Sequence, residues 1–205
     1  MTTNGRASVF NDMLTFSGVM YTPAHPRIED VRIVDIAHHL SLLCRYCGAS
    51  RRFYSVAEHS VLVSQVVPPE HALQGLLHDA TEAYVHDIIR ALKYNWLMWG
   101  YRMIEARNWR VIAAKFGVPE KLHSTVKAAD DAVLRAERLA LMPPHSQWTV
   151  RPADAAPVQI IGWSPELAED YYLQRFYELT RGHGCRFPNR RINRPRMLTL
   201  EGCAV

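Results

Sequence analysis

The chain has 205 residues, of which 48% are hydrophobic and 21% are charged, a composition typical of one globular domain with a sizeable core. It contains no run of about 18 apolar residues, and residues 1–14 hold no basic stretch leading into an apolar one, so we expect neither a membrane span nor a signal peptide. Four cysteines in a chain of this length do not indicate a disulfide framework, and we expect a cytoplasmic protein.

The net charge of +4 is concentrated near the C-terminus. Between Cys185 and Val205 there are five arginines and two prolines but one acidic residue, Glu201. This composition predicts a flexible basic tail over residues 183–205, attached to a single domain over residues 1–182. The domain alone is close to neutral, which argues against a protein whose main task is to grip a nucleic-acid duplex.

Helical periodicity dominates the domain, and the expected fold class is all-α. A short hairpin is expected over residues 14–21. Helices are expected over residues 28–47, 56–67, 69–79, 101–116, 120–141 and 165–181. Ser55 followed three residues later by Glu58 is a capping-box pattern, and Gly48, Gly117 and Gly182 are helix terminators. Residues 143–163 contain four prolines and are expected to form a loop.

Four ionisable residues stand among small or apolar neighbours in these helices: His59, His78, Asp79 and Asp130. A buried histidine or aspartate is costly unless it is paired or bound to a metal. Two imidazoles and two carboxylates suit Mn²⁺, Fe²⁺, Co²⁺ or Zn²⁺. Because a lone histidine on a helix is more often an ordinary packed or surface residue, the residues alone leave both interpretations open.

The pattern H…HD…D resembles the signature of the HD superfamily of metal-dependent phosphohydrolases. AEHS at 57–60, HDATE at 78–82 and VKAAD at 126–130 resemble bacterial 5'-deoxynucleotidases. Residues 33–60 resemble small phage HD proteins, a group that includes a dATP triphosphohydrolase. The resemblance covers roughly residues 12–181. It implies a single HD-domain helical bundle, a homo-oligomer, and hydrolysis of 2'-deoxynucleoside 5'-phosphates to deoxynucleoside plus triphosphate or phosphate.

The resemblance also assigns roles to residues. It implies that one divalent metal, Mn, Co, Zn, Fe or Mg, is bound by His59, His78, Asp79 and Asp130. The VKAAD register favours Asp130 over the adjacent Asp131. Asp79 and Glu82 are the implied catalytic residues. Glu82, one helical turn beyond Asp79, would orient or deprotonate the attacking water; its alternative role is a solvated carboxylate in a salt bridge.

Substrate contacts are expected at six positions, namely Arg45, Tyr46, Arg52, Asp87, Arg90 and Lys93. The resemblance implies four of them, and Arg52 and Arg90 are candidates because their charge could neutralise phosphate. Arg45 and Tyr46 would touch phosphate and base, Asp87 the deoxyribose, and the remaining cations the phosphates. Where the family often has a glycine before the aspartate and prolines after it, this chain has His86 and no proline. We therefore expect a changed backbone in this loop.

Two other functions stay open. One is an HD phosphodiesterase of a cyclic or signalling nucleotide, and the other is a non-catalytic nucleic-acid-binding protein that uses the arginine-rich tail. Cys44 and Cys47 are expected to be free thiols. His38 and His39 either support the metal ligands or pack as ordinary residues. The tryptophans are expected in the core or in an oligomer interface; they are Trp96, Trp99, Trp109, Trp148 and Trp163.

Overall fold

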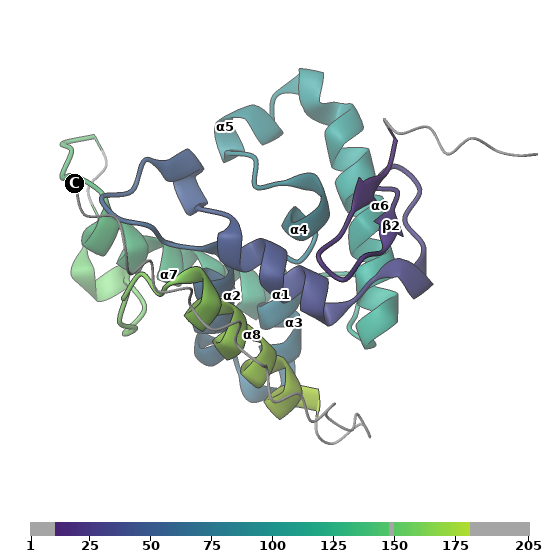
Figure 1. Cartoon of the computed structure of the whole chain (residues 1–205). Helices are drawn as coiled ribbons and strands as arrows, with labels where there is room; N and C mark the ends of the chain where they lie inside the picture. Colours follow the sequence, from purple (N-terminus) through teal and green to yellow (C-terminus); the bar gives the residue numbers. More distant parts are fainter. Residues whose placement is uncertain (1–10, 148–149, 181–205) are drawn as a thin grey trace, which may run out of the picture.

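The computed structural model describes residues 11–147 and 150–180, which form a mostly helical domain (Figure 1). The α-helices are α1 (Ile33–Leu42), α2 (Val56–Val66), α3 (Ala72–Leu77), α4 (Glu82–Val85), α5 (Arg90–Lys93), α6 (Trp99–Phe116), α7 (Ser124–Leu141) and α8 (Pro165–Thr180). The 3-10 helices are η1 (Ile28–Asp30), η2 (Arg45–Gly48), η3 (Pro69–His71), η4 (Trp96–Met98) and η5 (Pro152–Asp154). The all-α fold class is confirmed. Within the described residues no helix has both the length and the apolarity that a membrane crossing needs.

The core consists of two clusters of buried apolar side chains that share α2. One cluster joins α1, α2, α3 and α8 and includes Ile36 and Tyr172. The other joins α2 to α7 and includes Val63 and Val133. Helix α8 lies against α1 in front of α2 and α3, whereas α5 lies apart from them at the top of the view (Figure 1). Because α2 serves both clusters, its His59 is fully buried at the centre of the domain.

The predicted hairpin and most helix boundaries agree with the structure. Strands β1 (Met13–Leu14) and β2 (Met20–Tyr21) pair in an antiparallel manner. Helix α6 ends at Gly117, which has a left-handed φ of 69°. Helix α7 begins four residues later than residue 120, because His123 caps it. The predicted tail over 183–205, the end of the last helix and its terminator Gly182, and Trp148 lie outside the described residues.

The helix predicted over residues 28–47 is too long at both ends. After α1 the chain becomes extended, and Cys44 pairs with Ser55 in an isolated β-bridge. The Arg45 amide donates to the Tyr54 carbonyl at 2.9 Å. The pairing with a distant segment therefore outweighs the local helical periodicity, and it directs the following residues toward the interior.

The backbone then passes through the left-handed region three times in succession. The φ angles are 58° at Tyr46, 50° at Cys47 and 78° at Gly48. A left-handed conformation costs roughly 1–2 kcal/mol for a residue with a Cβ atom. The turn places the Tyr46 hydroxyl on the carboxylate of Glu137, so the strained segment carries a side chain of the candidate site.

The capping box at the start of α2 is only half formed. The Ser55 hydroxyl accepts from the Glu58 amide at 3.1 Å, as predicted. The fully buried Glu58 carboxylate does not complete the box; it accepts from the amides of Ile161 and Gly162 at 3.0 Å and of Trp163 at 2.6 Å. Since these charge-assisted bonds satisfy a buried anion, Glu58 fixes the end of the proline-rich loop against α2.

His86 has an unusual backbone conformation, with φ 72° and ψ 155°. This region is populated almost entirely by glycine, because a Cβ atom is crowded there. The imidazole is exposed, and the Tyr101 hydroxyl donates to the His86 carbonyl at 2.9 Å. The loop after α4 thus has a glycine-type geometry although the residue is a histidine.

We predict that His86→Gly raises the free energy of unfolding by about 1 kcal/mol. The substitution relieves roughly 1–3 kcal/mol of backbone strain in the folded state. This gain exceeds the cost of the larger conformational entropy that glycine gives the unfolded chain, which is roughly 0.5–1 kcal/mol. Urea denaturation of wild type, His86→Gly and His86→Ala measures this. His86→Ala is the matched control, because it removes the imidazole but keeps the Cβ atom. A glycine variant no more stable than the alanine variant contradicts the prediction.

Candidate metal centre

The HDATE motif lies at a break between two helices. Helix α3 ends at Leu77, and α4 begins at Glu82. The turn between them is closed by Ala80 N–H to Leu77 O at 2.9 Å and by Glu82 N–H to Asp79 O at 3.0 Å. The expected helical turn between Asp79 and Glu82 is therefore a tighter turn outside regular α-helix, which still brings both carboxylates to one pocket.

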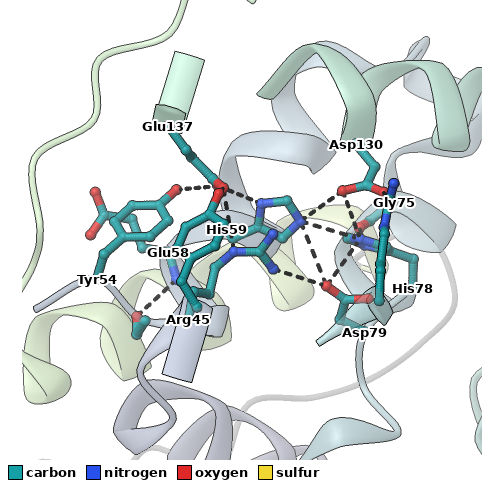
Figure 2. A network of polar contacts seen from close by, with 12 residues as sticks. Arg45, Tyr54, Glu58, His59, Gly75, His78, Asp79, Asp130 and Glu137 are labelled. Atoms are coloured by element: carbon teal, nitrogen blue, oxygen red, sulfur yellow. Dashed lines mark hydrogen bonds and ion pairs between the residues drawn. The ribbon is translucent and has the colours of Figure 1, made fainter. Parts of the chain in front are cut away.

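Three of the four predicted metal ligands form a compact group, the ligand cluster of His59, His78 and Asp79 (Figure 2). The two Nε2 atoms of the histidines are 3.4 Å apart. Asp79 Oδ2 lies 3.2 Å from His78 Nε2 and 3.6 Å from His59 Nε2. Bonds of about 2.0–2.2 Å to one ion separate its ligand atoms by roughly 3–3.6 Å. The spacing of these three atoms therefore fits a first-row divalent metal.

Asp130, the fourth predicted ligand, lies at the edge of this cluster. Its Oδ1 is 3.2 Å from His59 Nε2 and 4.0 Å from His78 Nε2, and its Oδ2 is 3.0 Å from Arg90 Nη2. Asp131 faces Arg90 Nη1 instead, at 3.5 Å. Of the two adjacent aspartates, Asp130, which the VKAAD motif favours, is therefore the one that approaches the cluster.

The outer nitrogens of the two histidines determine where their inner nitrogens point. His59 Nδ1 donates to Glu137 Oε1 at 2.6 Å, and His78 Nδ1 donates to the Gly75 carbonyl at 2.7 Å. A carboxylate and a carbonyl only accept, so both protons are placed on Nδ1. The Nε2 atoms then face each other, and two lone pairs at this distance are unfavourable unless a positive charge lies between them.

The charged residues around the two histidines favour a positive charge between the two Nε2 atoms. Burial and Arg45 lower the pKa of His59, but Glu137 and Asp130 outweigh them and raise it to about 9. Burial opposes ionisation of Asp79, yet the neighbouring imidazoles hold its pKa below the ordinary range. The neighbouring carboxylates would stabilise either a proton or a divalent ion at His59 Nε2. A metal that binds there would therefore displace a proton.

Glu137 is a residue of the candidate site that the sequence motifs did not single out. It is fully buried and accepts from His59, from the Tyr46 hydroxyl, and from the Tyr54 hydroxyl at 2.9 Å (Figure 2). Arg45 Nε lies 3.3 Å from its Oε2. Burial would raise the pKa of Glu137, but Arg45 and His59 lower it to about 2. Its spacing of seven from Asp130, two turns along α7, was the available signal.

Glu82 is buried next to the cluster, with 7% of its surface exposed. Its Oε2 has no hydrogen-bond partner among the described residues. Burial raises the pKa of Glu82 well above its ordinary value, and the charges of Asp79 and Asp87 raise it further. The alternative of a solvated carboxylate in a salt bridge is wrong.

The cluster opens into a cavity of about 890 Å³, the size of a small-molecule site. Its walls include five of the six predicted substrate contacts: Arg45, Tyr46, Asp87, Arg90 and Lys93. Arg45 is buried, and its Nη1 lies 3.4 Å from Asp79 Oδ2. Lys93 Nζ contacts Glu105 at 2.5 Å. Arg52 does not line the cavity, because its guanidinium donates to the Ile160 carbonyl at 2.8 Å.

The other residues considered earlier lie around the site rather than in it. His39 Nδ1 donates to the Ala83 carbonyl at 2.8 Å and so supports α4 beside Glu82. His38 pairs with Glu169 at 2.9 Å. Cys44 and Cys47 are free thiols, as expected.

Comparison with known proteins identifies a relative that matches this chain over nearly the whole of the relative's own length. The chain is 38% identical over 174 residues to the uncharacterized protein YfdR of Escherichia coli (strain K12), a match that spans 83% of this chain and 97% of YfdR. The chain belongs to the YfdR family. It is also 35% identical over 130 residues to an uncharacterized protein of Rhodobacter capsulatus, across 56% of this chain and 66% of that protein. No family model matches the chain. Neither relative's name states an activity.

We predict that Glu137→Gln weakens Mn²⁺ binding about 10–100-fold in this YfdR-family protein. The amide removes the charge that fixes the His59 ring. Isothermal titration calorimetry measures the dissociation constant. The control is Glu178→Gln, a partly exposed α8 carboxylate that contacts Arg175. Equal affinity in folded Glu137→Gln and wild-type protein contradicts the prediction.

Proposed function

We propose that this chain is a metal-dependent phosphohydrolase that acts on 2'-deoxynucleoside 5'-phosphates. The observation that carries the proposal is the Glu82 carboxylate, whose buried Oε2 has no hydrogen-bond partner among the described residues, in the cavity that His78 and Asp79 of the ligand cluster also line. An unsatisfied buried acid lowers stability, and such groups concentrate where chemistry uses them. The HD-type resemblance of the motifs supports the same role.

The residues present fit a metal. His59 Nε2, His78 Nε2 and Asp79 Oδ2 would hold the ion, and Asp130 Oδ1 is the fourth candidate ligand. This mixed nitrogen and oxygen set suits Mn²⁺, Fe²⁺, Co²⁺ or Zn²⁺ better than Mg²⁺, which prefers oxygen ligands. A divalent ion supplies two effects, acidification of water and polarisation of a phosphoryl oxygen.

Glu82 acts on the attacking water. Because burial and the neighbouring carboxylates raise its pKa, Glu82 has a higher affinity for a proton than an ordinary glutamate. A stronger base accepts the proton of water more effectively in the transition state. Oε2 is the atom available for this transfer, and His39 fixes the helix that carries it through the Ala83 carbonyl.

Arg45 and Lys93 stabilise the phosphate charge. Each is held by an ion pair, Arg45 with Glu137 and Lys93 with Glu105, and these pairs orient the side chains toward the cavity. A guanidinium has five N–H donors and an ammonium has three, so each retains donors for phosphate oxygens. Fixed cations at developing negative charge need no reorganisation during the reaction.

The substrate class follows from the cavity and the resemblance together. A cavity of about 890 Å³ accommodates a nucleotide, and its walls combine these cations with apolar side chains such as Trp109 and Leu122. Asp87 lines the same cavity and would contact the deoxyribose. The resemblance to the phage proteins favours a deoxynucleoside triphosphate, dATP-type, with triphosphate as product; release of phosphate from a monophosphate is the other reaction of the same site.

The test is a hydrolysis panel of dNMPs, dNTPs and matching ribonucleotides with Mn²⁺, Co²⁺ or Mg²⁺, with the products resolved by chromatography. We expect hydrolysis of deoxynucleotides and a loss of about 10²–10⁴-fold in Glu82→Gln, which keeps its bound metal. Glu120→Gln, an exposed carboxylate, is the control and keeps full activity. No hydrolysis by metal-loaded wild type, or equal activity in Glu82→Gln, contradicts the proposal; cleavage of cyclic nucleotides alone would indicate a phosphodiesterase.

A further inference from the structure

Residues 86–107, here called the arm, contain no buried residue; each one is half-buried or exposed. The arm comprises the loop after α4, helices α5 and η4, and the first half of α6, and α5 lies away from the packed helices at the top of Figure 1. The second half of α6 differs, because it buries Asn108, Ile112 and Ala113. The arm is therefore attached to the domain at its ends and packs little of its own length.

The arm is rich in large apolar side chains, although it is exposed. Its most exposed apolar side chains are Trp96 at 75%, Tyr94 at 73%, Leu97 at 66%, Trp99 at 61% and Leu92 at 55%. An aromatic side chain buries about 150–250 Å² when fully covered, so the three here, which are 61–75% exposed, offer roughly 300–500 Å² for an interface. With the leucines added, the surface approaches the roughly 800 Å² per partner of a stable interface. Five strongly exposed apolar side chains within eight consecutive residues are more than scattered single residues, and such a concentration is typical of an interaction site.

The patch is also without charge. No lysine, arginine, aspartate or glutamate occurs over residues 94–101. The neighbouring cations are directed to their own chain: Arg90 contacts Asp130 at 3.0 Å, and Arg102 donates to the carbonyls of Lys93 at 2.7 Å and Asn95 at 2.9 Å. An anionic membrane or a nucleic acid would be matched by outward cations. An uncharged aromatic patch is instead complementary to an identical patch.

The arm forms one wall of the cavity, since Asp87, Ile89, Lys93 and Arg102 line it. A wall must be held in place whenever the site is used. A second copy of the chain would hold this wall in place by burying the apolar faces of its helices. The exposure of the arm and its place in the site therefore point to the same occupant.

We infer that the arm is the interface of a homodimer in which two arms pack around a two-fold axis. Trp96, Leu97 and Trp99 of each copy are covered by the other copy, as an isologous contact requires. The inference rests on the exposure, area and charge of the arm, and it does not depend on the proposed phosphohydrolase activity.

Analytical ultracentrifugation of the full chain tests this from about 1 to 100 µM. Wild type is expected to sediment at twice the 23.5 kDa of the chain. Leu97→Glu places two carboxylates at the two-fold contact and is expected to weaken dimerisation at least about 100-fold. Trp96→Ala, which adds no charge, shifts the equilibrium in the same direction. Leu139→Glu, at a 48% exposed leucine on α7, is the matched control and remains a dimer. Circular dichroism checks that each variant is folded.

Two results overturn the inference. One is a wild-type monomer over the whole concentration range, and flotation of that monomer with lipid vesicles would identify the arm as a membrane-binding surface. The other is a dimer that Leu97→Glu and Trp96→Ala leave as stable as wild type, which would place the interface elsewhere. Since the readout is molecular mass, failure here is distinguishable from failure of the hydrolysis panel.

Discussion

Two imidazole nitrogens that face each other 3.4 Å apart are the constraint on which the site depends. The bond from His59 to Glu137 and the bond from His78 to Gly75 turn both rings the same way, with Nδ1 outward and Nε2 inward. Helices α2, α3 and α7 must therefore keep a fixed separation. Their apolar clusters provide it, and the carboxylates of Asp79 and Asp130 make the point between the rings favourable for a positive charge.

Buried anions connect this centre to the rest of the domain. Glu137 accepts three side-chain hydrogen bonds and forms one ion pair with Arg45, and Glu58 binds three successive amides of the proline-rich loop. Each is satisfied by several hydrogen bonds or ion-pair contacts, which offsets its desolvation. Glu82 is the contrast, since its Oε2 is buried beside the cluster and has no such partner in the part of the chain that the structure describes. Satisfied acids hold the framework, and the unsatisfied acid faces the cavity.

Much of the fold could be predicted from the sequence because its signals are local. Apolar periodicity and the terminator Gly117 gave the long helices, and the motif spacing identified the four candidate ligands. The misses are tertiary in origin. Extended pairing with Ser55 ended α1 early, and a loop about a hundred residues away captured the Glu58 carboxylate. Arg52 carries the right charge for phosphate, but the carbonyl that holds it is not visible in any local pattern.

The most direct test of the central claim is nitrogen NMR of the imidazole side chains before and after one equivalent of Zn²⁺, a diamagnetic ion. The geometry predicts that two of the ten histidines, His59 and His78, bind through Nε2 while both keep the proton on Nδ1. The resonances of these two rings should change together and reach saturation at one ion per chain. Binding through Nδ1, or no change in either ring, would contradict the account.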